Sequence, residues 1–179
     1  MSSTTHPFDL LIEIDRRSRE RALAGAEADG GDQLEGRLTL RLNEWNLMFA
    51  LEDVVELIPV PRVTVIAGVK SWLTGIANLR GTVITIVDMS QFFGGRTIRT
   101  TQVSRVVVVR SKEWLYGLLV DEIVGMRQFG PEKRLPNLDT IDAVLRPYLT
   151  DAFHSENKNW LAFSPDRLVN DTRFLDASA

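Results

Sequence analysis

Two pairs of adjacent carboxylates, Glu52-Asp53 and Asp121-Glu122, come nearest in this sequence to acid–base chemistry. A general acid and a general base must both face one substrate. Adjacent residues in a strand point to opposite faces, and adjacent residues in a turn are usually solvated. Neither pair is therefore predicted to be catalytic.

Other side chains that carry out catalysis or bind metals are scarce. The only histidines are His6, close to the amino terminus, and His154, in a polar stretch that is typical of a turn. The sequence contains no cysteine, so it has no disulfide, thiolate ligand or thiol nucleophile. Gly94-Gly95 lacks the Lys-Ser/Thr that a phosphate-binding loop requires. We expect no enzyme activity, no cofactor and no metal site.

The segment from Trp72 to Asp88 favours a binding role instead. Arg80 lies beside Gly81 and shortly after Gly75, between two apolar stretches. Glycine at such positions lets the backbone turn tightly or approach another segment closely. The pattern predicts a strand, a tight turn, a second strand and a helix start at Asp88. Arg80 at the corner is a candidate docking residue, and the alternative is an ordinary exposed arginine in a turn.

The composition is that of one globular domain, or of two small ones that share a core. The chain has 179 residues, of which 44% are hydrophobic and 25% are charged. Its net charge of −3 provides no general attraction to nucleic acid or anionic lipid. No basic amino-terminal region is present, and no apolar run approaches the roughly 20 residues of a membrane span. We expect a soluble, cytoplasmic protein that does not insert into the membrane.

The beginning of the chain differs from the rest. Pro7 and the short apolar face that follows it predict a helix over residues 7–23. Residues 24–32 are small and acidic, which is typical of a flexible linker. The sequence therefore predicts three parts: residues 1–35 as helix and linker, 36–171 as the main domain, and 172–179 as a C-terminal tail.

The main domain is predicted to be mainly β, because apolar and polar residues alternate and β-branched residues cluster. The predicted strands are residues 37–42, 45–49, 54–60, 75–78, 82–87, 106–109, 114–120, 123–129, 148–153 and 160–163. Val106–Val109 has no polar position and is expected to be buried on both faces. Short helices are expected after Asp88 and Ser164, whose side chains can cap them.

Two parts of the sequence share a plan. Residues 46–55 and 114–123 both predict a strand, an acidic corner and a second strand. Each is later followed by a hairpin that runs into a capped helix. Two similar β units that share apolar faces favour small closed barrels, because closure removes exposed sheet edges.

The segment around Arg80 resembles the signature of the CheW-like chemotaxis coupling proteins. In that family a glycine, an asparagine, an apolar residue and Arg-Gly precede an apolar strand that ends in Asp. Gly75, Asn78, Leu79, Arg80 and Asp88 match this signature, and the resemblance covers roughly residues 38–169. It implies two SH3-like β-barrels packed over a common core. It also implies a non-catalytic adaptor that bridges methyl-accepting chemoreceptors and a CheA-type histidine kinase at membrane-associated receptor arrays.

The resemblance further implies a partner-binding surface. The family places an acidic residue and an arginine near that surface, and Glu56 and Arg80 match them and are expected to pair. Trp72 is the tryptophan expected at an interface, because it stands beside the Gly- and Asn-containing corner. The other three tryptophans are expected in the core or at barrel seams. The candidate partner-binding residues are Val54, Glu56, Trp72, Asn78, Leu79 and Arg80.

Two features place the chain nearer to one branch of the family. The segment before the first strand and the Trp-Leu-Thr-Gly block at 72–75 are similar to the PilI-like couplers of type IV pilus chemosensory systems. The main alternative is a small-barrel protein that binds nucleic acid, and a hydrolase comes third. The negative net charge and the scarcity of aromatic–basic clusters count against nucleic-acid binding.

Overall fold

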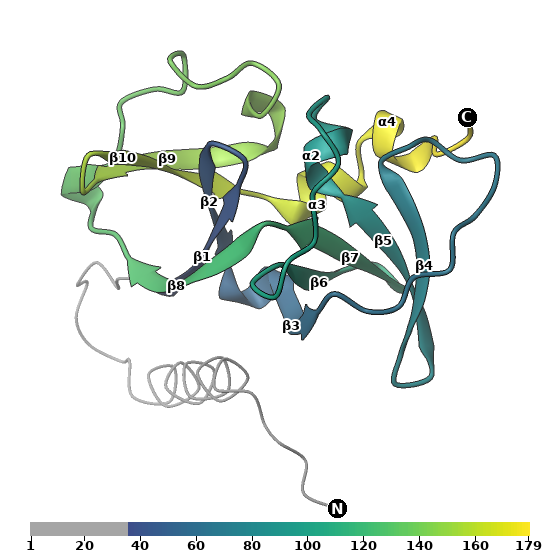
Figure 1. The fold of residues 1–179 in the computed structure, drawn as a ribbon. Coiled ribbons are helices and arrows are strands. Elements are labelled where there is room, and N and C mark those ends of the chain that lie inside the picture. Colours follow the sequence, from purple (N-terminus) through teal and green to yellow (C-terminus); the bar gives the residue numbers. More distant parts are fainter. Residues whose placement is uncertain (1–35) are drawn as a thin grey trace, which may run out of the picture.

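The computed structural model describes residues 36–179, which form ten strands and several short helices (Figure 1). The helix predicted over residues 7–23 and the linker after it lie outside the described residues. The strands are β1 (Gly36–Leu42), β2 (Trp45–Ala50), β3 (Val54–Pro59), β4 (Leu73–Leu79), β5 (Thr82–Asp88), β6 (Arg105–Ser111), β7 (Trp114–Val120), β8 (Glu122–Gln128), β9 (Leu149–Ser155) and β10 (Lys158–Phe163). The α-helices are α2 (Met89–Phe92), α3 (Pro165–Val169) and α4 (Thr172–Leu175).

The strands form two five-stranded sheets with the same plan. The first has the order β8-β1-β2-β10-β9, and the second has the order β3-β6-β7-β5-β4. In the first sheet, β2 of the β1–β2 hairpin pairs in parallel with β10, the last strand of the β9–β10 hairpin. In the second sheet, β7 of the β6–β7 hairpin pairs in parallel with β5, the last strand of the β4–β5 hairpin. The mainly β architecture of two small barrels is confirmed. We call them the first and the second barrel, in the order of the sheets above.

Each barrel combines strands from both halves of the chain. The first barrel takes β1 and β2 from the first half and β8, β9 and β10 from the second. The second barrel takes β3, β4 and β5 from the first half and β6 and β7 from the second. The repeat visible in the sequence is present, with β1–β5 as the first unit and β6–β10 as the second. The first hairpin of each unit belongs to the barrel that contains the remaining three strands of the other unit. The two repeats cannot separate without breaking strand pairs in both barrels, so we expect the two barrels to fold together.

Apolar side chains fill the barrels and the space between them. Each residue of Val106–Val109 is at most 1% exposed, which confirms that β6 is buried on both faces. In the second barrel Gly117 leaves room for its neighbours, since a Cβ atom there would lie 2.7 Å from both Ile86 Cδ1 and Val106 Cγ1. In the first barrel Met48, Trp160 and Ala162 form a separate buried cluster. Larger residues would not fit these close-packed interiors.

Both predicted helix caps are present. The Asp88 carboxylate accepts hydrogen bonds from the N–H groups of Gln91 at 3.1 Å and Ile98 at 2.8 Å. It therefore caps α2 and also holds the loop that follows. Ser164 Oγ accepts the N–H of Arg167 at 3.3 Å and caps α3. Burial raises the pKa of Asp88, although its hydrogen bonds to main-chain N–H groups oppose that rise.

Residues 172–179, predicted to be a tail, belong to the folded body. Phe174 of α4 is only 4% exposed. After α4 the main chain runs beside the loop that precedes β4. The N–H of Lys70 donates to the carbonyl of Ala177 at 2.9 Å, and the N–H of Ala179 donates to the carbonyl of Gly68 at 3.1 Å. The C-terminal segment thus ties this loop to the second barrel.

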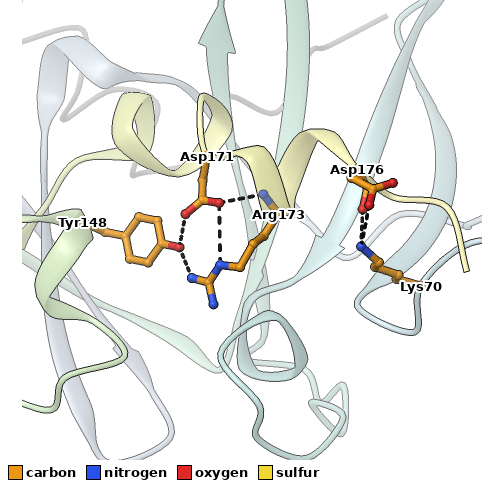
Figure 2. A network of polar contacts seen from close by, with 5 residues as sticks. All are labelled: Lys70, Tyr148, Asp171, Arg173 and Asp176. Carbon is orange, nitrogen blue, oxygen red and sulfur yellow. Dashed lines mark hydrogen bonds and ion pairs between the residues drawn. The ribbon is translucent and has the colours of Figure 1, made fainter.

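Polar side chains fasten α4 at both ends (Figure 2). The Asp171 carboxylate accepts the Tyr148 hydroxyl at 2.6 Å and the N–H of Arg173 at 2.7 Å. The Arg173 guanidinium also donates to the Tyr148 hydroxyl. At the other end Lys70 Nζ lies 2.5 Å from the Asp176 carbonyl and 3.3 Å from its carboxylate. The four-residue helix has too few apolar positions to be recognised by periodicity, and tertiary contacts hold it in place.

Candidate docking surface

Arg80 lies at the tip of the β4–β5 hairpin, as the sequence predicts. Leu79 pairs with Thr82, which leaves Arg80 and Gly81 as a two-residue loop. Their φ angles are 51° and 89°, and two positive φ angles in succession are the mark of a type I′ turn. The side-chain oxygen of Asn78 accepts the N–H of Gly81 at 2.8 Å and stabilises the turn. The same left-handed φ occurs at Asn43, Lys112 and Glu156, so it is a requirement of these hairpin turns.

The Arg80 guanidinium forms an ion pair with Glu56, with 2.6 Å between Nη2 and Oε1. Glu56 belongs to β3, at one edge of the sheet, and the tip belongs to the hairpin at the other edge, so the pair bridges the two edges of the second barrel. The Arg80 side chain is 77% exposed, and that of Glu56 is 18% exposed. A pair this open contributes only about 0–1 kcal/mol to stability. The guanidinium therefore remains available to a partner, and the predicted pairing is confirmed.

Three other predicted residues surround this pair in different ways. Val54 is buried and its main chain pairs with Val109, so it supports the surface from below. A bulge between Val54 and Glu56 turns Val55 outward, and Val55 is the exposed valine of this strand. Leu79 is half-buried against the core, while Asn78 is exposed at the turn. Sequence reasoning missed Val55 because a bulge shifts which face each residue occupies.

Trp72 does not lie on an accessible surface, contrary to the interface position expected for it. Its side chain is 8% exposed and packs between Phe92 and Phe174. Its carbonyl accepts the N–H of Asp88 at 2.8 Å, which links the start of β4 to the end of β5. The ring is buried because α4 covers it, and α4 was not expected from the sequence.

A different tryptophan is exposed. Trp114, expected in the core or at a barrel seam, is 69% exposed at the start of β7. In the parallel pair of β5 and β7, Thr85 lies opposite Tyr116. Continued two residues toward the start of both strands, this register brings the exposed Val83 level with Trp114. Both are exposed apolar residues, and their placement at the starts of neighbouring strands is visible only from the cross-strand register.

The Asp121-Glu122 pair has structural partners. The Asp121 carboxylate accepts the N–H of Asn43 at 2.6 Å, and Glu122 forms an ion pair with Arg41 at 2.6 Å. Burial, more than any other influence, raises the pKa of Asp53. In the part of the chain that the structure describes, no group of three or more His, Asp and Glu side chains is arranged to hold a metal ion. No helix within residues 36–179 is long and apolar enough to cross a membrane.

Comparison with known proteins agrees with this architecture. The family model of the CheW-like domain matches residues 37–173. The chain is 33% identical over 178 residues to Protein PilI of Pseudomonas aeruginosa, and the match covers 99% of each sequence. It is 25% identical over 89 residues to the Chemotaxis protein CheW of Thermotoga maritima, a match that covers 50% of this chain and 58% of that protein.

The fold is also similar to a solved structure. The crystal structure of the scaffolding protein TtCheW from Thermoanaerobacter tengcongensis superposes with a TM-score of 0.69 at 19% identity, and the match covers 82% of this chain and 95% of that one. At this identity the likeness concerns the fold alone. The family match and the full-length similarity to PilI establish that this chain belongs to the CheW-like family of adaptor and scaffold proteins.

Proposed function

We propose that this protein is a non-catalytic adaptor that couples methyl-accepting chemoreceptors to a CheA-type histidine kinase in a cytoplasmic, membrane-associated array. The full-length similarity to PilI favours a chemosensory system that controls type IV pilus twitching motility. An adaptor of this kind acts by holding receptor and kinase together. Two contacts of modest affinity on one rigid body raise the effective concentration of one partner at the other.

The observation that carries this proposal is the Arg80 turn. An exposed arginine is held at a hairpin tip by the turn that Asn78 stabilises and by the ion pair with Glu56. Its guanidinium is 77% exposed while its position is fixed, which suits a side chain that docks a partner. The tip belongs to a barrel whose interior is closely packed, so the side chain is presented from a rigid base.

A titration with purified partners tests this function. The full chain is titrated separately with a CheA-type kinase and with the cytoplasmic part of a chemoreceptor from the same organism. We expect Arg80→Glu to weaken binding of at least one partner by about tenfold or more, since it places a carboxylate beside Glu56 and reverses the exposed charge. The matched control is Arg99→Glu, which reverses an exposed arginine in the loop after α2.

The outcomes separate the proposed function from its alternative. Binding of both partners by the parent chain, together with a selective loss in Arg80→Glu and an unchanged circular dichroism spectrum, supports the coupling role. If the parent chain binds neither protein partner but binds single-stranded RNA or DNA, the adaptor proposal is wrong. If Arg80→Glu and Arg99→Glu bind equally well, the docking surface lies elsewhere on the molecule.

A further inference from the structure

Strand β7 turns two aromatic side chains toward the outside of the second barrel. A Cβ atom at Gly117 would lie 2.7 Å from Ile86 Cδ1, so this position faces the barrel interior. Side chains alternate between the two faces of a strand, so Tyr116 and Trp114 face outward. Helix α4 covers Tyr116, since the Phe174 ring lies edge-on to the Tyr116 ring with 5.3 Å between their centroids. Trp114 remains 69% exposed.

Strand β5 continues the uncovered part of this face. Thr85 lies opposite Tyr116 in the parallel pair of β5 and β7, and Val83, two residues earlier, is on the same side of its strand as Thr85. The Val83 side chain is 60% exposed, whereas Ile84 is 1% exposed. We call Val83 and Trp114 together the Trp114 face. It lies on two inner strands of the sheet and not on the edge strands β3 and β4.

The first part of the chain, which lies outside the described residues, has a composition that suits this face. Phe8, Leu11 and Ile12 share one side of the helix predicted over residues 7–23. Basic residues begin only at Arg16, so residues 7–15 offer an apolar side with acidic residues around it. A helix of this kind is stabilised mainly by packing its apolar side against another element.

The connection to the described domain is long enough for such a contact within one chain. Residues 24–35 can span roughly 40 Å when they are extended. A domain of this size has a radius of gyration of about 15 Å, so the tethered segment can reach any part of its surface. The tether also gives the segment an effective concentration on the order of millimolar at the face. A weak contact is therefore favoured within one chain over the same contact between two chains.

We propose that residues 7–15 pack their apolar side against the Trp114 face of the same chain, beside α4. This contact continues one that is already present, because α4 places Phe174 on Tyr116 and leaves the next outward position of each strand uncovered. The two ends of the chain then cover one continuous face of the second barrel. Since β5 begins directly after the Arg80 turn, the docked segment borders the candidate docking surface. The contact needs neither receptor nor kinase, so it does not depend on the proposed coupling role.

Disulfide trapping in the full chain tests this contact. The sequence contains no cysteine, so an introduced pair provides the only thiols. One variant carries Leu11→Cys with Val83→Cys. The control carries Leu11→Cys with Val103→Cys, since Val103 is similarly exposed at 56% but precedes β6, whose opposite end leads into β7. Disulfide formation under a mild oxidant is followed by mass spectrometry over a concentration series, and thermal melts check that both variants are folded.

A second measurement uses Trp114 itself and needs no introduced cysteine. Acrylamide quenching of tryptophan fluorescence is compared between the parent chain and Ile12→Asp, which places a charge on the apolar side of the segment. The same comparison is made in a Trp114→Phe background, where the other three tryptophans report any general change. We expect Ile12→Asp to increase quenching and to shift the emission to longer wavelength only when Trp114 is present.

The outcomes decide between this occupant and others. The pair at positions 11 and 83 is expected to form a disulfide within one chain about tenfold or more faster than the control pair, at a rate independent of protein concentration. Equal rates for the two pairs overturn the proposal. Disulfides that form only between chains, and faster at higher concentration, overturn it in favour of a second copy as the occupant. Quenching that Ile12→Asp leaves unchanged overturns it as well.

Discussion

The indole ring of Trp72 stacks on the phenyl ring of Phe174, with 5.4 Å between their centroids and 20° between their planes. Trp72 directly precedes β4, and Phe174 belongs to α4. Phe174 also contacts Phe92 and Tyr116 edge-on. The contact makes α4 a cover for the second barrel and explains why a tryptophan next to the candidate docking turn is not itself accessible.

Truncating Phe174 should therefore destabilise the whole domain. Phe174→Ala is expected to lower the free energy of unfolding by about 3–5 kcal/mol, because it removes a buried aromatic side chain and leaves a cavity against Trp72. Chemical denaturation measures the change. The control is Leu175→Ala in the same helix, whose side chain is 62% exposed and whose loss should have little effect. Equal effects of the two changes would show that α4 does not belong to the core.

Gly75 should be intolerant of any side chain. A Cβ atom there would lie 2.2 Å from the carbonyl oxygen of Thr64, whose main chain pairs with Ile76. Gly75→Ala must displace that loop and is expected to lower the melting temperature markedly. The control is Gly81→Ala, which also has positive φ but no heavy atom within 4 Å of the new Cβ atom. Its cost should be limited to about 1 kcal/mol of backbone strain. A milder effect at Gly75 than at Gly81 would contradict the close approach.

A charge in the middle of β6 should prevent folding. Val107 is fully buried and lies in the shared core, so Val107→Asp places a carboxylate where it has no partner. The expected loss is several kcal/mol, enough to unfold a domain of ordinary stability. Arg110→Asp, at an exposed position of the same strand, is the control and should melt cooperatively near the parent temperature. A normal melt for Val107→Asp would mean that β6 is not buried.

The acid stability of the protein should depend on Asp171. A hydrogen bond from the Tyr148 hydroxyl is the main cause that lowers the pKa of this carboxyl below its usual value. A lowered pKa contributes stability above the pKa of the unfolded chain, and that contribution is lost as the pH falls through the folded-state value. Asp171→Asn keeps a residue that can cap α4 but removes the titration.

Unfolding measured from neutral pH down through the acid range tests this dependence. The parent should lose more stability below about pH 4 than Asp171→Asn does, because only the parent takes up this proton. The difference between the two proteins should be largest at neutral pH and shrink at low pH. If the free energy of unfolding falls equally with pH in parent and variant, the hydrogen bond from Tyr148 does not determine the loss of stability in acid.

Much of the local structure followed from short-range patterns. Alternation of apolar and polar residues located the strands, and the side-chain oxygens of Asp88 and Ser164 marked two helix starts. Arg80 before Gly81 marked a two-residue hairpin turn, and the family resemblance led to its pairing with Glu56. These features depend on residues near one another in sequence or on a short motif, so the sequence alone is sufficient to predict them.

Tertiary structure alone decided how the two repeats are combined. The local sequence of β1 and β2 does not indicate that they pair with β8 and β10 rather than with β3 and β5. The same non-local packing buries Trp72 under α4, exposes Trp114 and places Arg127 beside Glu156. Such arrangements depend on which apolar faces fit together and on cross-strand register, and both are set by contacts between residues far apart in the chain.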